Sequence, residues 1–85
     1  MKVVWKYALS TSAAQTIFSA PKGAEFIRFA MQNDEPHVWA IVDEENAMVS
    51  RTLQIFGTGR TIPRGAKYIG TCDQGAFVWH LFELL

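Results

Sequence analysis

The chain has 85 residues, enough for one domain with a hydrophobic core and too few for two. Hydrophobic residues make up 49% of it and aromatic residues 13%, which excludes an intrinsically disordered chain. Eight basic residues balance eight acidic ones, so the sequence also argues against a general nucleic-acid-binding protein, which is usually basic.

Cysteine content and hydrophobic runs indicate the compartment. Cys72 is the only cysteine, so no disulfide can form within the chain, whereas small secreted domains usually contain several. The apolar run at residues 3–5 ends at Lys6 and is too short for a signal peptide. No run reaches the roughly 18 apolar residues of a membrane-spanning helix. We therefore expect a cytoplasmic protein without membrane contacts.

Taken in order, most of the chain alternates in hydrophobicity with period two, which predicts β-strands. Val3, Trp5 and Tyr7, for example, share one face of the first segment. The expected strands are residues 3–9, 14–19, 25–32, 37–43, 48–56, 67–72 and 76–85. The expected turns are residues 10–12, 21–23, 33–36, 43–46 and 73–75, and a short helix over residues 44–48 is the alternative at the fourth turn.

Two positions and one segment within these strands carry specific expectations. Arg51 shares a strand face with apolar residues, so it should be paired or close to a sheet edge. Gly70 predicts a bulge or the close approach of another backbone. Residues 76–85 are apolar on both faces, which predicts a central strand that is covered on both sides and dominates the stability.

Two parts of the chain resemble each other. Residues 21–27 (PKGAEFI) parallel residues 63–69 (PRGAKYI), and a Val-Trp pair follows each of them, at residues 38–39 and 78–79. One interpretation is two similar hairpins packed face to face, each contributing a tryptophan to a shared core. The alternative is that β-proteins reuse the same turn chemistry.

These elements favour an all-β fold over residues 1–85, a small antiparallel sandwich or barrel of six to seven short strands. Such a fold leaves sheet edges exposed and has a limited core. We therefore expect a homo-oligomer that pairs edges or buries aromatic faces.

The segment 57–65 is the candidate ligand site. Gly57, Thr58, Gly59 and Arg60 could form a cradle of backbone N–H groups for an anion, and Arg64 adds a second guanidinium. The segment is neither a Walker loop nor a dinucleotide fingerprint. The alternative is a bend that the glycines permit.

Tryptophans could complete this site by stacking on a planar base. Trp5, Trp39 and Trp79 are the three available, and Trp5 and Trp39 are retained as ligand-binding candidates. The alternative is that each belongs to the core or to an oligomer interface.

Catalysis and metal binding find no support in the sequence. His80 shares a strand face with Val78 and Phe82, which favours a hydrogen-bonded structural histidine over a catalytic base. No serine has the context of a nucleophile elbow, and Cys72 has no evident activator. The two histidines and one cysteine do not make a zinc site. We expect no enzyme activity, no metal and no cofactor.

Six segments, in their order along the chain, are similar to a group of short proteins encoded by tailed bacteriophages and prophages. They are residues 6–9 (KYAL), 21–24 (PKGA), 38–43 (VWAIVD), 56–59 (FGTG), 68–71 (YIGT) and 78–83 (VWHLFE). The resemblance implies a phage origin, a β-rich fold and action in the host cytoplasm. Since that group has no established function, it implies no catalytic residues.

A small phage protein without enzyme activity suggests two functions. The first is a counter-defence protein that sequesters a small anionic ligand, such as a cyclic nucleotide immune signal. The Gly-Thr-Gly-Arg loop and Arg64 favour it. The second is a protein-interaction or virion-associated module that binds a host or phage protein. The zero net charge and the lack of a strong phosphate motif favour this alternative.

Overall fold

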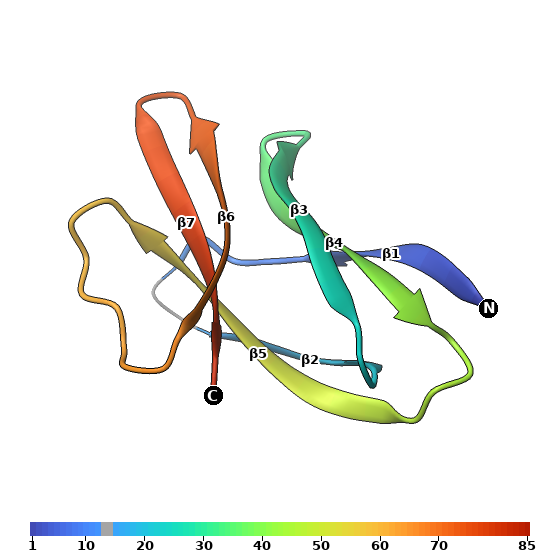
Figure 1. Cartoon of the computed structure of the whole chain (residues 1–85). Coiled ribbons are helices and arrows are strands. Elements are labelled where there is room, and N and C mark those ends of the chain that lie inside the picture. Colours follow the sequence, from blue (N-terminus) through green and yellow to red (C-terminus); the bar gives the residue numbers. More distant parts are fainter. Residues whose placement is uncertain (13–14) are drawn as a thin grey trace.

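The computed structural model describes residues 1–12 and 15–85, and the described part is built from seven strands (Figure 1). The strands are β1 (Lys2–Ala8), β2 (Thr16–Pro21), β3 (Glu25–Gln32), β4 (Glu35–Asp43), β5 (Met48–Gly57), β6 (Lys67–Gln74) and β7 (Phe77–Leu84). The start of the expected strand 14–19 lies outside the described residues. Residues 44–46 form a turn closed by a hydrogen bond from Asn46 N to Asp43 O, so the alternative of a helix there is wrong.

The strands form two antiparallel sheets, in the orders β1-β4-β3 and β2-β5-β7-β6. The sheets pack as a sandwich and do not close into a barrel, so the all-β expectation is confirmed. β3 and β6 lie against each other where the two sheets meet, as the ribbon also shows (Figure 1).

The core lies between the sheets, where alternate residues of the strands meet. Its two clusters share the aromatic side chains of Tyr7, Phe18 and Phe26. The buried members are Phe29, Val38, Leu53, Ile55 and Leu81 in one cluster and Ala20, Ala24, Ala40 and Val42 in the other. The buried residues of β4, Val38, Ala40 and Val42, occupy alternate positions, which agrees with the period-two pattern predicted for a strand.

The expectation for the last strand is only half right. β7 is central in its sheet, between β5 and β6, and Leu81 is fully buried. Phe77 and Val78, however, expose 61% and 39% of their surface, so the strand is not covered on both sides. Both residues lie at the tip of the β6–β7 hairpin, which projects beyond the rest of its sheet at the top of Figure 1.

Arg51 is paired, which is one of the two alternatives expected from the sequence. Its guanidinium forms a two-pronged ion pair with Glu83, and Nη1 also donates to Ala24 O at 3.1 Å. The guanidinium lies over the ring of Phe26, 4.7 Å from its centroid. The Tyr7 hydroxyl is buried without a hydrogen-bond partner in the described structure. Burial raises the Tyr7 pKa, an effect that the charge of Arg51 opposes.

The two similar segments begin two hairpins of like geometry. Gly23 and Gly65 have φ angles of +86° and +79°, and each turn is closed by a hydrogen bond from alanine N to proline O. β3 and β6 have eight residues each, and their registers shift between Phe26 and Arg28 and between Tyr68 and Gly70. A Cβ on Gly70 would lie 3.2 Å from Phe29 Cβ, so Gly70 marks both a bulge and a close approach, as predicted.

The tryptophans of the two hairpins do not correspond. Trp79 is opposite Cys72 and packs against the core, whereas Trp39 is opposite Arg28 and alternates with the buried Val38 and Ala40. Trp39 therefore lies on the outer face of its sheet, because successive side chains of a strand point to opposite faces. The expectation that each hairpin gives a tryptophan to a shared core is wrong for Trp39.

Candidate functional site

The predicted loop crosses one face of the four-stranded sheet because of the strand order. β5 and β6 are both neighbours of β7, so residues 58–66 must pass from one side of β7 to the other. The loop starts with a turn closed by a hydrogen bond from Arg60 N to Gly57 O at 3.2 Å. Gly59 has a φ of +92°, a conformation that favours glycine. The glycines thus permit the bend, as the alternative interpretation of this segment states. Ligand binding at the bend depends on the side chains around it.

A chain of hydrogen bonds fixes the start of the loop to the sheet. Thr58 Oγ1 lies 2.9 Å from His80 Nε2, and Thr71 Oγ1 lies 3.0 Å from His80 Nδ1. The Tyr68 hydroxyl continues the chain to Thr71 Oγ1 at 2.7 Å. His80 is half-buried and hydrogen-bonded at both ring nitrogens, in agreement with a structural histidine.

Beneath the loop, three aromatic rings pack on the outer face of the sheet. Phe82 makes edge contacts with Phe56 and Tyr68, with centroid distances of 5.6 and 5.5 Å. Phe56 is only 7% exposed although it faces away from the core, as its pairing with His80 shows. The loop therefore stands on a small apolar layer of its own.

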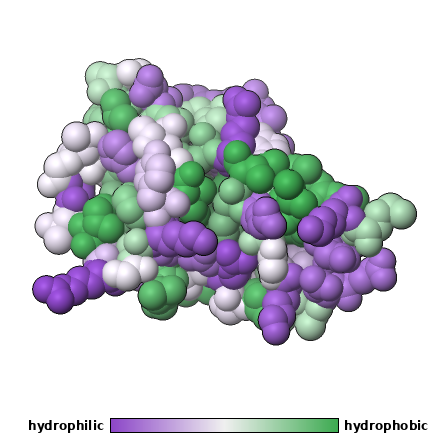
Figure 2. Space-filling model, in the orientation of Figure 1, coloured by the Kyte–Doolittle hydropathy of each residue, from purple (hydrophilic) through white to green (hydrophobic). Residues whose placement is uncertain are grey.

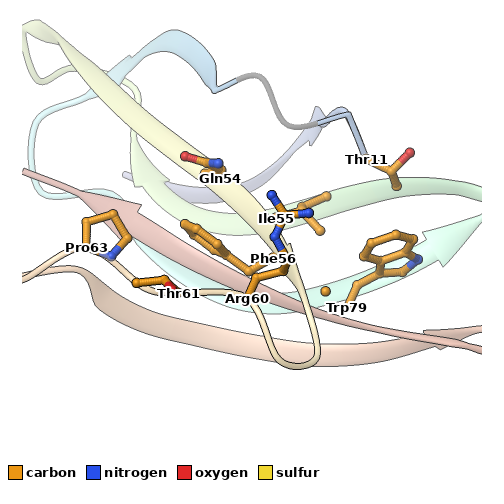
Figure 3. A pocket seen from close by; sticks show the side chains of 9 residues that line it. Thr11, Gln54, Ile55, Phe56, Arg60, Thr61, Pro63 and Trp79 are labelled. Atoms are coloured by element: carbon orange, nitrogen blue, oxygen red, sulfur yellow. The ribbon is translucent and has the colours of Figure 1, made fainter.

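Two hollows adjoin the loop, with volumes of about 400 and 520 Å³, and Gly57, Arg60 and Trp79 line both. In the first, Figure 3 shows Arg60 between Trp79 at one end and Pro63 at the other. The other residues that line the first hollow are Thr11, Gln54, Ile55, Phe56 and Thr61. Those that complete the second are Thr58, Ala76, Phe77 and Val78.

Arg60 is the charged group of both hollows. It is exposed, and within residues 1–12 and 15–85 its guanidinium has no ion pair and no hydrogen bond. The indole of Trp79 is held from two sides, since its Nε1 donates to Gln74 Oε1 at 2.9 Å and its ring stacks on Phe77 at a centroid distance of 5.4 Å. An unpaired cation therefore adjoins an ordered aromatic surface.

The structure brings together only part of the predicted site. Gly57, Thr58 and Arg60 line the hollows, while Arg64 is exposed at the far turn of the loop and lines neither. Trp5 packs into the core from β1, and Trp39 lies on the outer face of the other sheet. Neither tryptophan approaches the loop. Trp79, which is not among the predicted site residues, lies beside the loop instead.

Trp79 could not be found from the sequence because its position depends on the pairing of β5 with β7. This pairing sets Gly57 opposite Trp79, and a Cβ on Gly57 would lie 3.5 Å from the indole. The repeated Val-Trp pair marks Trp79 as unusual but says nothing about its neighbours.

Other chemistry is sparse in the part of the chain that the structure describes. No three side chains of His, Cys, Asp and Glu there gather closely enough to hold a metal ion. None of the described residues forms a helix long and apolar enough to cross a membrane. Cys72 is half-buried, and its thiol pKa is raised by burial and, to a smaller extent, by the Asp73 carboxylate.

Comparison with known protein families gives a match over the whole chain. Residues 1–85 match the family model described as a domain of unknown function, DUF7352. Neither a curated protein nor a solved structure matches the chain.

Proposed function

This chain belongs to the DUF7352 family, and we propose that it binds a small anionic ligand with a planar ring, such as a cyclic nucleotide, beside Arg60. The observation that carries the proposal is the free guanidinium of Arg60 at the border of two adjoining hollows. Arginine without a carboxylate partner is well suited to phosphate, because its planar fork donates two parallel hydrogen bonds.

The dimensions of the site fit this class of ligand. Ligand pockets commonly enclose about 300–1,000 Å³, and each of the two hollows falls within that range. A phosphate on Arg60 leaves a planar base within reach of Trp79 and Phe77, whose stacked rings offer an extended aromatic surface. Gly57 lets the chain run close to the indole.

Ligand binding without enzyme activity is the basis of the biological role that we propose. The protein is a non-enzymatic phage accessory protein that acts in the host cytoplasm, where it sequesters a cyclic nucleotide immune signal and so counters host defence. We propose that it works as a homo-oligomer. The exposed apolar side chains of several strands support this, because surfaces of that kind are frequently buried between subunits.

The test is a thermal-shift measurement with a panel of mononucleotides and cyclic dinucleotides, combined with native mass spectrometry of the protein purified from bacteria. A ligand at 100 times its Kd should stabilise the fold by about 2.7 kcal/mol, and Arg60→Ala should abolish this shift. Arg64→Ala is the matched control, since Arg64 lines neither hollow. No shift with any nucleotide, or equal shifts in wild type and Arg60→Ala, would reject the proposal.

The second candidate function is a protein-interaction or virion-associated module. The tip of the β6–β7 hairpin favours it, because Phe77 and Val78 are exposed there beside Arg60. Figure 2 shows further apolar patches, in green, between hydrophilic ones on one face of the molecule. Capture of a defined host or phage protein that Phe77→Ser abolishes and Arg60→Ala leaves intact would decide for this function.

A further inference from the structure

Among the residues that the structure describes, no loop crosses the outer face of the β1-β4-β3 sheet, in contrast to the outer face of the other sheet. On β4, His37, Trp39 and Ile41 alternate with buried residues and point away from the core. The neighbouring strands add exposed apolar side chains to this region, Val4 at 55% and Ile27 at 52%. A central strand that presents aromatic groups on an uncovered sheet face provides a surface for a ligand.

Strand pairing sets one row of three residues across this face. Lys6 on β1 and Arg28 on β3 are both opposite Trp39 on β4. The guanidinium carbon of Arg28 lies 5.8 Å from the centroid of the Trp39 ring, and the His37 ring centroid lies 6.0 Å from it. Three planar groups are therefore contiguous, with a lysine on the opposite side of the tryptophan.

The two cations of this row are not neutralised. Within the described residues neither Lys6 nor Arg28 has an ion pair, and Lys6 Nζ donates instead to the amide oxygen of Gln32 at 2.5 Å. The next row towards the β3–β4 turn contains His37 between two alanines and has no carboxylate. The next row in the other direction contains one, Glu25 opposite Ile41. The two cations thus belong to the strands that flank Trp39, and the carboxylates on this face of β3 and β4, Glu25, Glu35 and Asp43, lie in other rows.

We propose that this row, Lys6–Trp39–Arg28, binds a short segment of single-stranded nucleic acid. Bases stack on the planar faces of Trp39, His37 and Arg28, and Lys6 and Arg28 contact phosphates. The strand must be single because a duplex hides the faces of its bases. An acidic peptide would use the two cations but has little use for three contiguous planar groups.

The zero net charge of the chain limits the affinity of this surface for nucleic acid. No long-range field attracts a polyanion, so binding depends on the local row and reaches one or two phosphates. We therefore expect dissociation constants on the order of tens of micromolar at low salt, with a shallow salt dependence of about 0.7 in logarithmic slope for each phosphate contact. This agrees with a protein that is not a general nucleic-acid binder.

The experiment is fluorescence anisotropy with a labelled oligothymidylate of about 15 nucleotides at low and moderate salt. Trp39→Leu should weaken binding about tenfold or more. Trp39→Phe, which keeps an aromatic ring, should retain most of the wild-type affinity. The double variant Lys6→Gln and Arg28→Gln should weaken binding and remove most of the salt slope. Circular dichroism and urea unfolding confirm that each variant is folded.

Two cations away from the row serve as controls. Arg64→Ala, in the loop on the other sheet but lining neither hollow, and Lys22→Gln, in an exposed turn, should leave oligonucleotide binding unchanged. The inference is wrong if wild type gives no anisotropy change, if Trp39→Leu binds the oligonucleotide as tightly as wild type, or if Arg64→Ala weakens binding as much as Trp39→Leu. It is also wrong if duplex DNA or poly-glutamate competes as well as the unlabelled single strand. Oligonucleotide binding at the Arg60 site would persist in Trp39→Leu, so the test distinguishes the two sites.

Discussion

The hairpins β3–β4 and β6–β7 have the same local structure but bury opposite faces. Each starts with a Pro-basic-Gly-Ala turn, carries a bulge two residues into its first strand and reverses through a two-residue turn. Phe29 and Thr71 occupy the same position in the two hairpins, counted from these turns. Phe29 is opposite Val38 in the core, whereas Thr71 is opposite His80 on the outer face.

The difference separates two kinds of information in the sequence. Turns and bulges depend on a few adjacent residues, so similar heptapeptides give similar hairpins. Which face is buried depends on the side chains at alternate positions, and these differ between the hairpins. A local repeat can therefore produce one backbone shape in two opposite environments.

The largest difference in stability should come from shortening the side chains at the equivalent positions 29 and 71. Phe29→Ala should lower the free energy of unfolding by about 4 kcal/mol, because it leaves a cavity in the core. Thr71→Ala should cost about 1 kcal/mol, since the residue is exposed and loses only hydrogen bonds to Tyr68 and His80. Urea denaturation measures both. Equal losses would show that the two hairpins do not differ in their buried faces.

The sequence predicts the strands and turns well because both depend on local signals. For Arg51 it left two alternatives, pairing or a place near a sheet edge, and the structure shows the pairing. For Gly70 it predicted a bulge or the close approach of another backbone, and the structure shows a bulge and a close approach to Phe29. The sequence could not decide which face of β4 is buried by its pattern alone, because apolar residues such as Val38 and Trp39 occupy both faces. Apolar residues on both faces of residues 76–85 gave the wrong expectation of full burial for the same reason.

The candidate site was less predictable than the fold. The loop itself stands out by its glycines and arginines, but its neighbours depend on the strand order β5-β7-β6. This order sends the loop across β7 and sets Trp79 beside Arg60. Hydrophobic periodicity does not report which strands pair, so Trp5 and Trp39 could not be told apart from Trp79.

A second test concerns positions 28 and 70, which also correspond. An alanine Cβ at Gly70 would lie 3.2 Å from Phe29 Cβ, an atom too close to the backbone to move alone, so β3 and β6 must separate. Gly70→Ala should therefore destabilise by about 2 kcal/mol. Arg28→Ala should cost less than about 1 kcal/mol, the size of its contact with Trp39. If Gly70→Ala unfolds at the same urea concentration as wild type, the approach of the two strands is looser than the geometry indicates.

Substitution of the two turn glycines should lower the stability by similar amounts. This prediction tests the similarity of the two hairpins and not their difference. Both have positive φ, so Gly23→Ala and Gly65→Ala should each cost about 1 kcal/mol. A Cβ on Gly65 would also meet Leu85 Cδ1 at 3.0 Å, but this atom is the far end of an exposed, flexible side chain and can move. Unfolding midpoints of the two variants should differ little. A much larger effect at Gly65 would mean that Leu85 is held in place.

The smallest expected effect distinguishes Cys72 from Ala30, its counterpart in the first hairpin. Burial raises the pKa of the Cys72 thiol above its ordinary value of about 8.5, so the folded protein keeps a proton that the unfolded chain releases. The unfolded state then binds fewer protons, and stability should decline as the pH rises from about 8.5 towards the pKa of the folded state. Urea unfolding between pH 7.5 and about 9.5 measures this decline below the ordinary range of tyrosine, near 10. The Met1 amino group, whose pKa is raised mainly by its hydrogen bond to Glu45, adds a decline of the same sign. Cys72→Ala, which copies the first hairpin, should therefore reduce the slope, and equal slopes in both proteins would show that the thiol is not protected by burial.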